Sequence, residues 1–359
     1  MANKRSKLDI SSIHRQLKNH DAVLYNGIKN FENKQSLVCF VRILACSGGY
    51  RNSFSDAWCE TEIDYTKCVL YKHLFDIGIL EKFLDTGVLP NSLNENQKYI
   101  VLLALQTLAL FMDDYEETNK IIQKYRKTSL KEVYWTGIFG THIIKKLATS
   151  KNMKVSECGY ENCGAEQCHC GCGEQLVYGD TSMGHREVWH GSVDILLQSA
   201  AVEVTTEEIE DLEDFEMKID DLEKQPFPQA IVTSCSMRGP TPLITVSKTN
   251  VKIFLYDYDS DLLFESEEFF FDMKLEISTI LGLWLAINNQ AFGLPINPAF
   301  IEAGCRSGFK TLMQEANKLD VYENHTHLYG CKNVCNIGLP IHEVFSRTKR
   351  GNIQIILPK

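Results

Sequence analysis

Trp189-His190-Gly191-Ser192-Val193-Asp194-Ile195-Leu196-Leu197, followed by Ala200-Ala201-Val202-Glu203-Val204-Thr205, is the stretch that decides the fold prediction. Both runs are apolar and rich in β-branched residues, which is typical of strands, and Gln198-Ser199 between them suits a tight hairpin. Asp194 and Glu203 interrupt these runs, and a carboxylate is costly to bury unless it is paired or bound to a cation. Two carboxylates on adjacent strands predict a site for Mg²⁺ or Mn²⁺. The alternative is that Asp194 ends a turn and Glu203 faces solvent.

The chain after Thr205 predicts the rest of a mixed α/β sheet flanked by helices. An acidic segment covers 207–223, and a helix is expected over 226–236. Two strands joined by the polar turn Lys248-Thr249-Asn250 are expected over 242–248 and 251–257. Residues 264–272 predict a further strand or the approach to a helix over 273–288.

The order strand, strand, helix, strand, strand, with Asp on the first strand and Glu on the second, resembles the PD-(D/E)XK nuclease superfamily. This is the restriction-endonuclease-like fold of RecB- and λ-exonuclease-like enzymes. The resemblance covers about residues 130–290, is divergent, and rests on short, degenerate motifs. It implies that Asp194 and Glu203 bind the catalytic Mg²⁺ or Mn²⁺ together with the Val204 carbonyl, and that Gln229 is the helix Gln of RecB-like members.

The resemblance also implies an extra acid on the helix that precedes the first core strand. Glu132 on the helix expected near 130–147 is one candidate, and Glu157 and Glu174 beside the cysteines are the others.

One position departs from the family pattern. Thr205 stands where the motif Lys, which orients the attacking water and offsets charge on the phosphate, is expected. Thr can hydrogen-bond a water but supplies no positive charge. Lys224 or Lys218 could substitute from the following segment; otherwise the domain binds rather than cuts.

A cysteine-rich insertion over 157–174 predicts a structural Zn²⁺ site. Close-spaced thiols with intervening glycines in a chain without a signal peptide favour zinc over disulfides. The expected ligands are Cys158, Cys163, Cys168 and either Cys170 or Cys172. Four cysteines elsewhere lie in apolar surroundings and are expected to be small core residues: Cys39, Cys46, Cys68 and Cys235.

A second group of metal-ligand types lies near the C-terminus. His325, His327, Cys331 and Cys335 have the residue types and spacing of a Cys₂His₂ zinc site. The alternative is two surface histidines beside two buried thiols.

Composition bounds the partners and the compartment. The net charge of −10 argues against broad nucleic-acid affinity, but much of the excess lies in 207–223. Lysines and arginines between 120 and 154 flank the expected core and predict either a phosphate track or a solvated helix face. No run reaches the ~18 apolar residues of a membrane span, and no apolar core follows the basic start, so we expect an intracellular protein, cytoplasmic or nuclear, with no membrane partner.

Three regions are expected along the chain. Residues 1–125 are expected to form an α-helical region, with apolar positions three and four apart over 70–84 and 99–112 and a Ser92/Glu95 capping box. Residues 126–290 are expected to form the nuclease-like core, and 291–359 a C-terminal extension.

Two functions follow from these observations. The first is a metal-dependent nuclease acting on DNA or RNA. The second is a catalytically inactive, zinc-stabilised scaffold that binds a protein partner through the helical N-terminal region.

Overall fold

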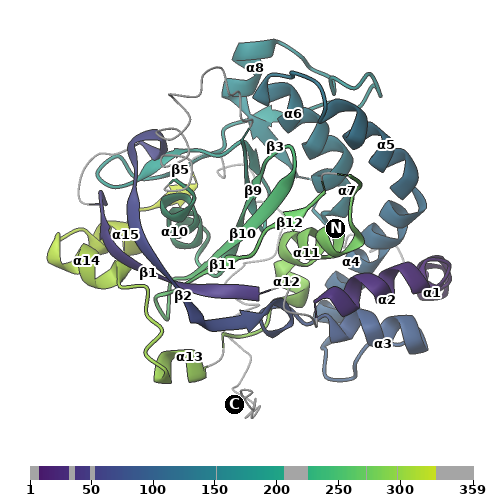
Figure 1. Ribbon diagram of the computed structural model, residues 1–359, viewed down its shortest axis with the longest axis horizontal. Helices are drawn as coiled ribbons and strands as arrows, with labels where there is room; N and C mark the ends of the chain where they lie inside the picture. Colours follow the sequence, from purple (N-terminus) through teal and green to yellow (C-terminus); the bar gives the residue numbers. More distant parts are fainter. Residues whose placement is uncertain are drawn as a thin grey trace, which may run out of the picture.

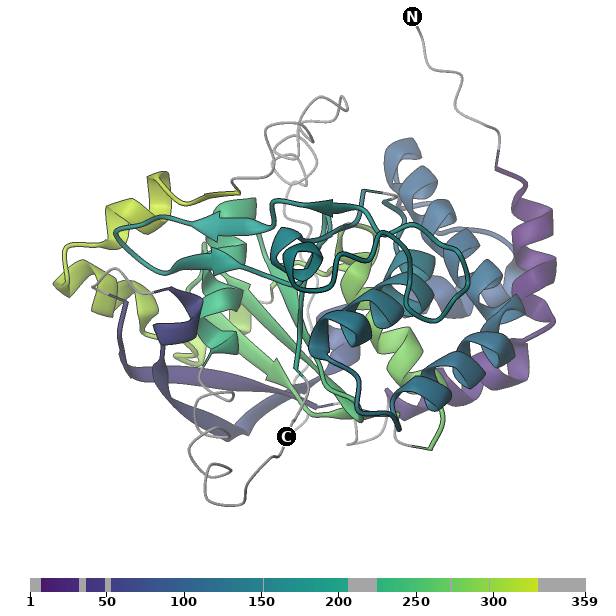
Figure 2. The same ribbon diagram turned by 90° about the horizontal axis from the view of Figure 1, so that it is seen from above.

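The computed structural model describes residues 8–31, 37–48, 53–150, 152–205, 225–271, 273–296 and 298–328. These residues form an α/β fold in which a mixed sheet is flanked by helices (Figure 1). Figure 2 gives the view from above, with the N-terminal helices gathered at one end of the sheet and the last helices at the other. None of the helices in the described ranges has the length and hydropathy needed to cross a bilayer.

The main sheet has ten strands within the described residues. Its order is β2-β1-β11-β10-β9-β8-β7-β3-β4, and β12 pairs with β10. The pairs β8/β9 and β3/β4 are parallel, and the others are antiparallel. The strands are β1 Leu37–Cys46, β2 Cys59–Leu70, β3 Lys154–Ser156, β4 Tyr178–Gly179, β7 Ile195–Leu196, β8 Ala201–Val204, β9 Thr241–Val246, β10 Asn250–Asp257, β11 Leu262–Ser266 and β12 Phe269–Phe270.

A smaller sheet has the order β13-β5-β6. Its strands are β5 Ser182–Gly184, β6 His190–Ser192 and β13 His327–Leu328. Gly184 has φ +95°, and a Cβ there would lie 2.2 Å from the Trp189 carbonyl oxygen. Only glycine therefore fits at this position, where β5 pairs with β6.

The helices fall before, between and after the strands. Those in the first half are α1 Ile10–Lys18, α2 Asp21–Asn30, α3 Gly78–Thr86, α4 Glu95–Asp113, α5 Tyr115–Tyr125, α6 Glu132–Phe139, α7 Lys145–Leu147 and α8 Glu157–Cys163. Those in the second half are α10 Pro226–Met237, α11 Ile277–Ile287, α12 Asn289–Phe292, α13 Pro298–Glu302, α14 Phe309–Glu315 and α15 Leu319–Asn324. A π-helical turn, Gly140–Ile144, joins α6 to α7.

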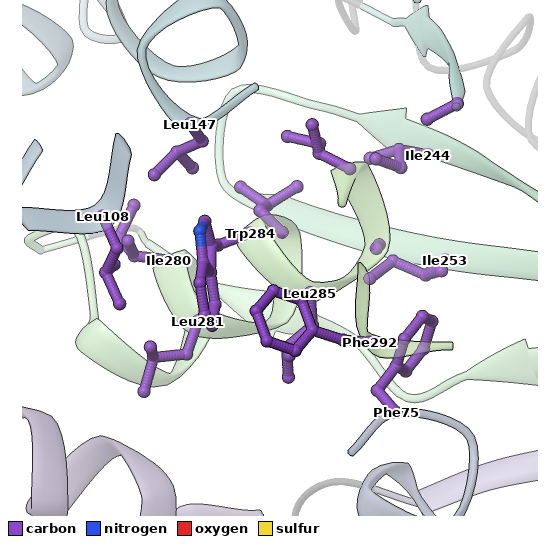
Figure 3. Close-up of a cluster of buried hydrophobic side chains, with 14 of the residues drawn as sticks. Phe75, Leu108, Leu147, Ile244, Ile253, Ile280, Leu281, Trp284, Leu285 and Phe292 are labelled. Carbon is purple, nitrogen blue, oxygen red and sulfur yellow. The ribbon is translucent and has the colours of Figure 1, made fainter. Parts of the chain in front are cut away.

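Two hydrophobic cores cover the two faces of the sheet. Successive residues of a strand point to opposite faces, so neighbouring strand residues belong to different cores. Ile244 and Ile253 join the core that contains α4 and α11, whereas Leu243 and Phe254 join the core that contains α10, α14 and α15. Figure 3 shows the first core, where Trp284 of α11 packs among Leu108, Leu147 and Phe292. The sheet and α10 therefore hold the stretch around Asp194 and Glu203 between two apolar layers.

The elements expected after Thr205 are confirmed, with small shifts in their bounds. The helix expected over 226–236 is α10, the two strands are β9 and β10, and the helix expected over 273–288 is α11. The expected strand over 188–197 is divided: β6 pairs with β5 in the small sheet, and only β7 joins the main sheet. Asp194 lies at the bend between them, consistent with the low strand preference of Asp.

The expectation of an α-helical N-terminal region was wrong in part. Helices α1 to α5 are present, but β1 and β2 pair at one edge of the main sheet. In the partly exposed edge strand β2, polar residues are at least as numerous as apolar ones, and this pattern is weaker than the periodicity of the neighbouring helices. The capping box of α4 is formed by Asn94 and Gln97 rather than Ser92 and Glu95.

The sheet also crosses the expected region boundaries. Strands β1 and β2 precede residue 126, and α14 and α15, which follow residue 290, pack in the α10-side core.

Trp284→Ala is expected to lower the free energy of unfolding by about 3–5 kcal/mol, because it leaves a large cavity in the core and removes a buried hydrogen bond. The Trp284 side chain is fully buried, and its Nε1 donates to the Ala104 carbonyl oxygen at 2.9 Å. Leu110→Ala, at an exposed position of α4, is the control and should change the value by less than about 0.5 kcal/mol. Urea unfolding of both variants checks this, and equal losses would contradict the packing described.

Candidate functional site

Asp194 and Glu203 face each other across two antiparallel strands. In the β7–β8 pair, Ile195 is opposite Val202 and Leu196 is opposite Ala201. Extending this register by one step places Asp194 opposite Glu203. Oδ2 of Asp194 accepts a hydrogen bond from the Val204 N–H at 2.7 Å, which ties the carboxylate to the neighbouring strand.

Both carboxylates lie on the sheet face that α10 covers. Leu196 and Ala201 belong to the α10-side core, and residues two positions along a strand share a face. Asp194 and Glu203 are therefore on that same face. The alternative, with Glu203 facing solvent, does not fit, because its Oε2 atom is buried.

Gln229 of α10 completes this acidic site. Its side chain is fully buried and lies close enough to Glu203 to lower the Glu203 pKa, yet neither its amide nitrogen nor its amide oxygen has a hydrogen bond of normal geometry. Glu203 Oε2 is also without a hydrogen-bond partner. Buried polar atoms are nearly always satisfied, so unpartnered atoms on facing side chains mark the place of a missing polar ligand, a cation or water. The oxygens of Asp194, Glu203 and Gln229 fit a hard divalent cation.

The electrostatics of the site also favour a cation. Burial raises the pKa of Asp194 to about 7, an effect that the Val204 N–H opposes. Burial and then the charge of Asp194 raise the pKa of Glu203 well above its usual range. Glu132, the first residue of α6, raises both pKa values further, so three acids from three elements act on one another. Glu132 is exposed, whereas the other two are largely withdrawn from solvent.

The positions proposed to supply positive charge are only partly described. Thr205 follows β8 and donates its backbone N–H to the Val246 carbonyl oxygen at 2.8 Å. Lys218 and Lys224 lie outside the described residues. The role expected for the Val204 carbonyl stays a prediction, since the bond that reaches Asp194 comes from the Val204 N–H.

A second group of ligand atoms forms a candidate metal centre. One ligand atom from each of His142, Cys168, Cys170 and Cys172 lies within 4.8 Å of all the others. His142 Nε2 is 3.0 Å from Cys170 Sγ and 3.8 Å from Cys168 Sγ, and the two sulfurs are 3.4 Å apart. These four residues could hold a metal ion.

The local backbone explains how these side chains converge. His142 is the central residue of the π-helical turn, and such turns often mark functional positions. The loop that carries Cys168, Cys170 and Cys172 turns back on itself: Gln167 pairs with Gln175 in an isolated antiparallel bridge, and the Gly171 N–H donates to the Cys168 carbonyl oxygen at 3.2 Å. Gly171 and Gly173 have φ of +83° and +80°, which curls the loop around the centre in a conformation that glycine adopts without strain.

The candidate group differs from the expected ligand set at two points. Cys158 lies on α8, is exposed and stands outside the group. His142 was missed, because a single His within the apolar run Ile138–Ile144 is typical of a core residue. Cys163 ends α8, and its side chain is outside what the structure describes.

The C-terminal His/Cys group is described only in part. His325 follows α15 and His327 lies in β13, where it pairs with Gly184. The ring of His325 is 6.3 Å from that of His185, which the sequence did not single out. Cys331 and Cys335 lie outside the described residues.

Two of the four cysteines expected in the core are bonded to each other, and of these Cys39 is buried as expected whereas Cys68 is half-buried. Cys39 and Cys68 form a disulfide between β1 and β2, whereas Cys235 is a free, buried thiol as expected.

Comparison of the chain with protein-family models, curated protein sequences and solved structures gives no match.

Asp194→Asn is expected to raise the free energy of unfolding at about pH 8 by roughly 1–2 kcal/mol when no divalent cation is added, because the amide removes a desolvated charge. The carboxyl pKa is raised in the folded protein, so the penalty is absent below its unfolded pKa near 3.9 and complete above about 7. The gain should therefore shrink as the pH falls through this window. Urea unfolding across the pH range checks this, with the exposed Glu302→Gln as control; a loss of stability at pH 8 would show that the ionised carboxylate is a structural element.

Proposed function

We propose that the protein is a metal-dependent nuclease of PD-(D/E)XK type that hydrolyses phosphodiester bonds in DNA or RNA. The observation that carries this proposal is the pair Asp194 and Glu203, opposed on one sheet face beneath the unpartnered amide of Gln229. Structural ion pairs place opposite charges together, whereas this site gathers acids, a pattern typical of cation-dependent catalysis.

The order of the elements supports the proposal. β7, β8, α10, β9 and β10 follow one another as strand, strand, helix, strand and strand, with Asp194 immediately before the first strand and Glu203 in the second. α6 precedes these strands and carries Glu132, which acts on both carboxyls. This agrees with the extra acid that the family resemblance implies.

Each residue has a defined task in this mechanism. Asp194 and Glu203 hold Mg²⁺ or Mn²⁺, the Val204 N–H fixes the orientation of Asp194, and Gln229 positions a polar group of the substrate or a water. When bound, the cation supplies a water of lowered pKa and stabilises charge that develops on the phosphate. The apolar cores on both sides exclude bulk water, which strengthens these electrostatic interactions.

The positive charge expected from a motif Lys must come from elsewhere than Thr205. We propose that Lys224, or Lys218, reaches the site from the segment that leads to α10. In the basic stretch over 120–154, Lys145 pairs with Glu174 and Lys146 pairs with Asp114. Part of this stretch is therefore engaged in ion pairs.

Asp194→Asn and Glu203→Gln are each expected to abolish Mn²⁺-dependent cleavage, because the cation would lose a charged ligand. Cleavage of single-stranded and duplex DNA and RNA is measured with Mg²⁺ and with Mn²⁺, and Glu302→Gln serves as the matched surface control. Lys224→Ala should cost on the order of 10²-fold in rate, as loss of one transition-state charge contact does, and Lys218→Ala should cost less.

A wild-type rate equal to that of Asp194→Asn on every substrate would contradict the nuclease proposal. Thr205→Lys then distinguishes two kinds of inactive domain. Restored cleavage would indicate a domain that lacks only the positive charge of the motif Lys, whereas continued inactivity would indicate a domain that binds without cutting.

The second candidate function is a zinc-stabilised scaffold that binds a protein partner, and Thr205 at the motif Lys position favours it. We propose that His142, Cys168, Cys170 and Cys172 bind one Zn²⁺. A tetrahedral ion with Zn–S of ~2.3 Å and Zn–N of ~2.0–2.1 Å requires ligand atoms about 3.6–3.8 Å apart. The observed separations of 3.0, 3.4 and 3.8 Å lie near these edges. Four protein ligands leave no open position, so the centre is structural.

Cys170→Ser is expected to reduce bound zinc from about one ion per chain to a small fraction, and to lower thermal stability, because structural zinc contributes folding free energy directly. Cys158→Ser is the matched control and should retain the full content, since Cys158 is exposed and outside the group. Elemental analysis of protein prepared under reducing conditions checks both. Absorption of the Co²⁺-substituted wild-type protein should show charge transfer from three thiolates, and zinc loss in Cys158→Ser would refute this ligand set.

A further inference from the structure

The edge ribbon formed by β1 and β2 carries four cysteines as two cross-strand pairs. In the register of this ribbon, Cys39 is opposite Cys68 and Cys46 is opposite Cys59. The first pair is a disulfide with a Cα–Cα distance of 4.1 Å. The second pair is reduced, at the other end of the same ribbon.

Hydrogen bonding shows that Cys46 and Cys59 occupy a closely spaced position. The neighbouring pair is bonded: Ser47 N–H donates to the Trp58 carbonyl oxygen at 3.1 Å, and Trp58 N–H donates to Ser47 Oγ at 3.0 Å. Bonded and non-bonded pairs alternate along an antiparallel ladder, so Cys46 and Cys59 form a non-hydrogen-bonded pair. Such pairs have Cα atoms about 4.5 Å apart, within the range that a disulfide spans.

The two thiols differ in access. Cys46 is half-buried, whereas Cys59 is 2% exposed and packed in the α10-side core. A hydrogen bond from Cys59, assisted by the Gly48 N–H, lowers the pKa of Cys46, and burial raises the pKa of Cys59. Cys46 is thus the accessible sulfur with more thiolate character, and Cys59 is the partner held against it.

We propose that Cys46 and Cys59 are a thiol–disulfide exchange site whose substrate is a small-molecule disulfide. The Cys46 thiolate attacks one sulfur of that disulfide, which forms a mixed disulfide and releases one thiolate. Cys59 loses its proton and attacks the Cys46 sulfur, which forms the Cys46–Cys59 bond and releases the second thiolate. Two protein thiols are oxidised, one small disulfide is reduced to two thiols, and the two protons end on those thiols.

The pair is connected to the segment that leads to Asp194. Ser47 Oγ accepts a hydrogen bond from Trp189 Nε1 at 3.2 Å, and the Gly48 carbonyl oxygen accepts one from the Tyr322 hydroxyl at 3.5 Å. Oxidation would therefore fix the end of the ribbon that contacts Trp189. This inference is independent of the nuclease proposal, because it concerns the ribbon alone.

The test incubates the full chain, with its Cys39–Cys68 bond intact, in glutathione buffers of increasing oxidised fraction. Remaining thiols are then alkylated and peptides mapped by mass spectrometry. We expect a cross-linked peptide pair joining Cys46 to Cys59, with loss of two hydrogen atoms, and faster alkylation of Cys46 than of Cys59 in the reduced protein. The cross-link should reverse fully when reduced glutathione is restored.

Cys59→Ser should instead stop at a stable glutathione adduct on Cys46, because the second attack has no sulfur. Cys305→Ser, a buried cysteine outside the ribbon, is the matched control and should form the Cys46–Cys59 bond as the wild type does. The wild-type mapping keeps the test decisive if Cys59→Ser does not fold. A persistent Cys46 adduct in the wild type, linkage of Cys46 to another cysteine, or free thiols at full oxidation would each overturn the proposal.

Discussion

The desolvation of two carboxyl groups on neighbouring strands is the constraint on which the rest of this structure depends. Burying Asp194 and Glu203 opposes folding, and both pKa values rise in consequence. The fold tolerates this cost because two apolar cores enclose the strands from both faces. The Val204 N–H compensates one oxygen of Asp194, while Glu203 Oε2 and the Gln229 amide remain uncompensated. The cation proposed for this site would give these atoms a partner.

α6 connects this acidic site to the cysteine loop. At its start Glu132 acts on the two carboxyls, and two residues later Tyr134 stacks on His169 with ring centroids 4.1 Å apart. Gly137 offers its carbonyl oxygen to Cys168 Sγ at 3.8 Å, and the helix continues into the turn that holds His142. The cysteine loop therefore contacts α6 at two points and holds in place the helix that carries Glu132.

Local patterns allowed the centre of the fold to be predicted from sequence. The apolar runs on either side of Gln198-Ser199 indicated the β7–β8 hairpin, and the run after Pro226 indicated α10, because these elements have strong periodicity and clear turns. The strands β1 and β2 were missed: the edge strand β2 has a weak pattern because it is partly exposed, and the apolar run of β1 was not assigned to a strand. His142 could not be assigned to the metal group, because its approach to Cys168 depends on tertiary packing across 26 positions. A charge substituting for Thr205 also cannot be located from spacing alone.

The π-helical turn at Gly140–Ile144 holds one more residue than an α-helical turn would. Each residue of an α-helix rotates the chain by about 100°, so the turn shifts the angular phase between α6 and α7 by that amount. The extra residue lets side chains before and within the turn point in different directions. Trp135 of α6 points toward the sheet, and His142 of the turn points toward the cysteine loop. Loss of one residue here would restore a regular helix and change the direction of the side chains around His142 relative to the cysteines. The length of this segment is then constrained as well as the identity of His142.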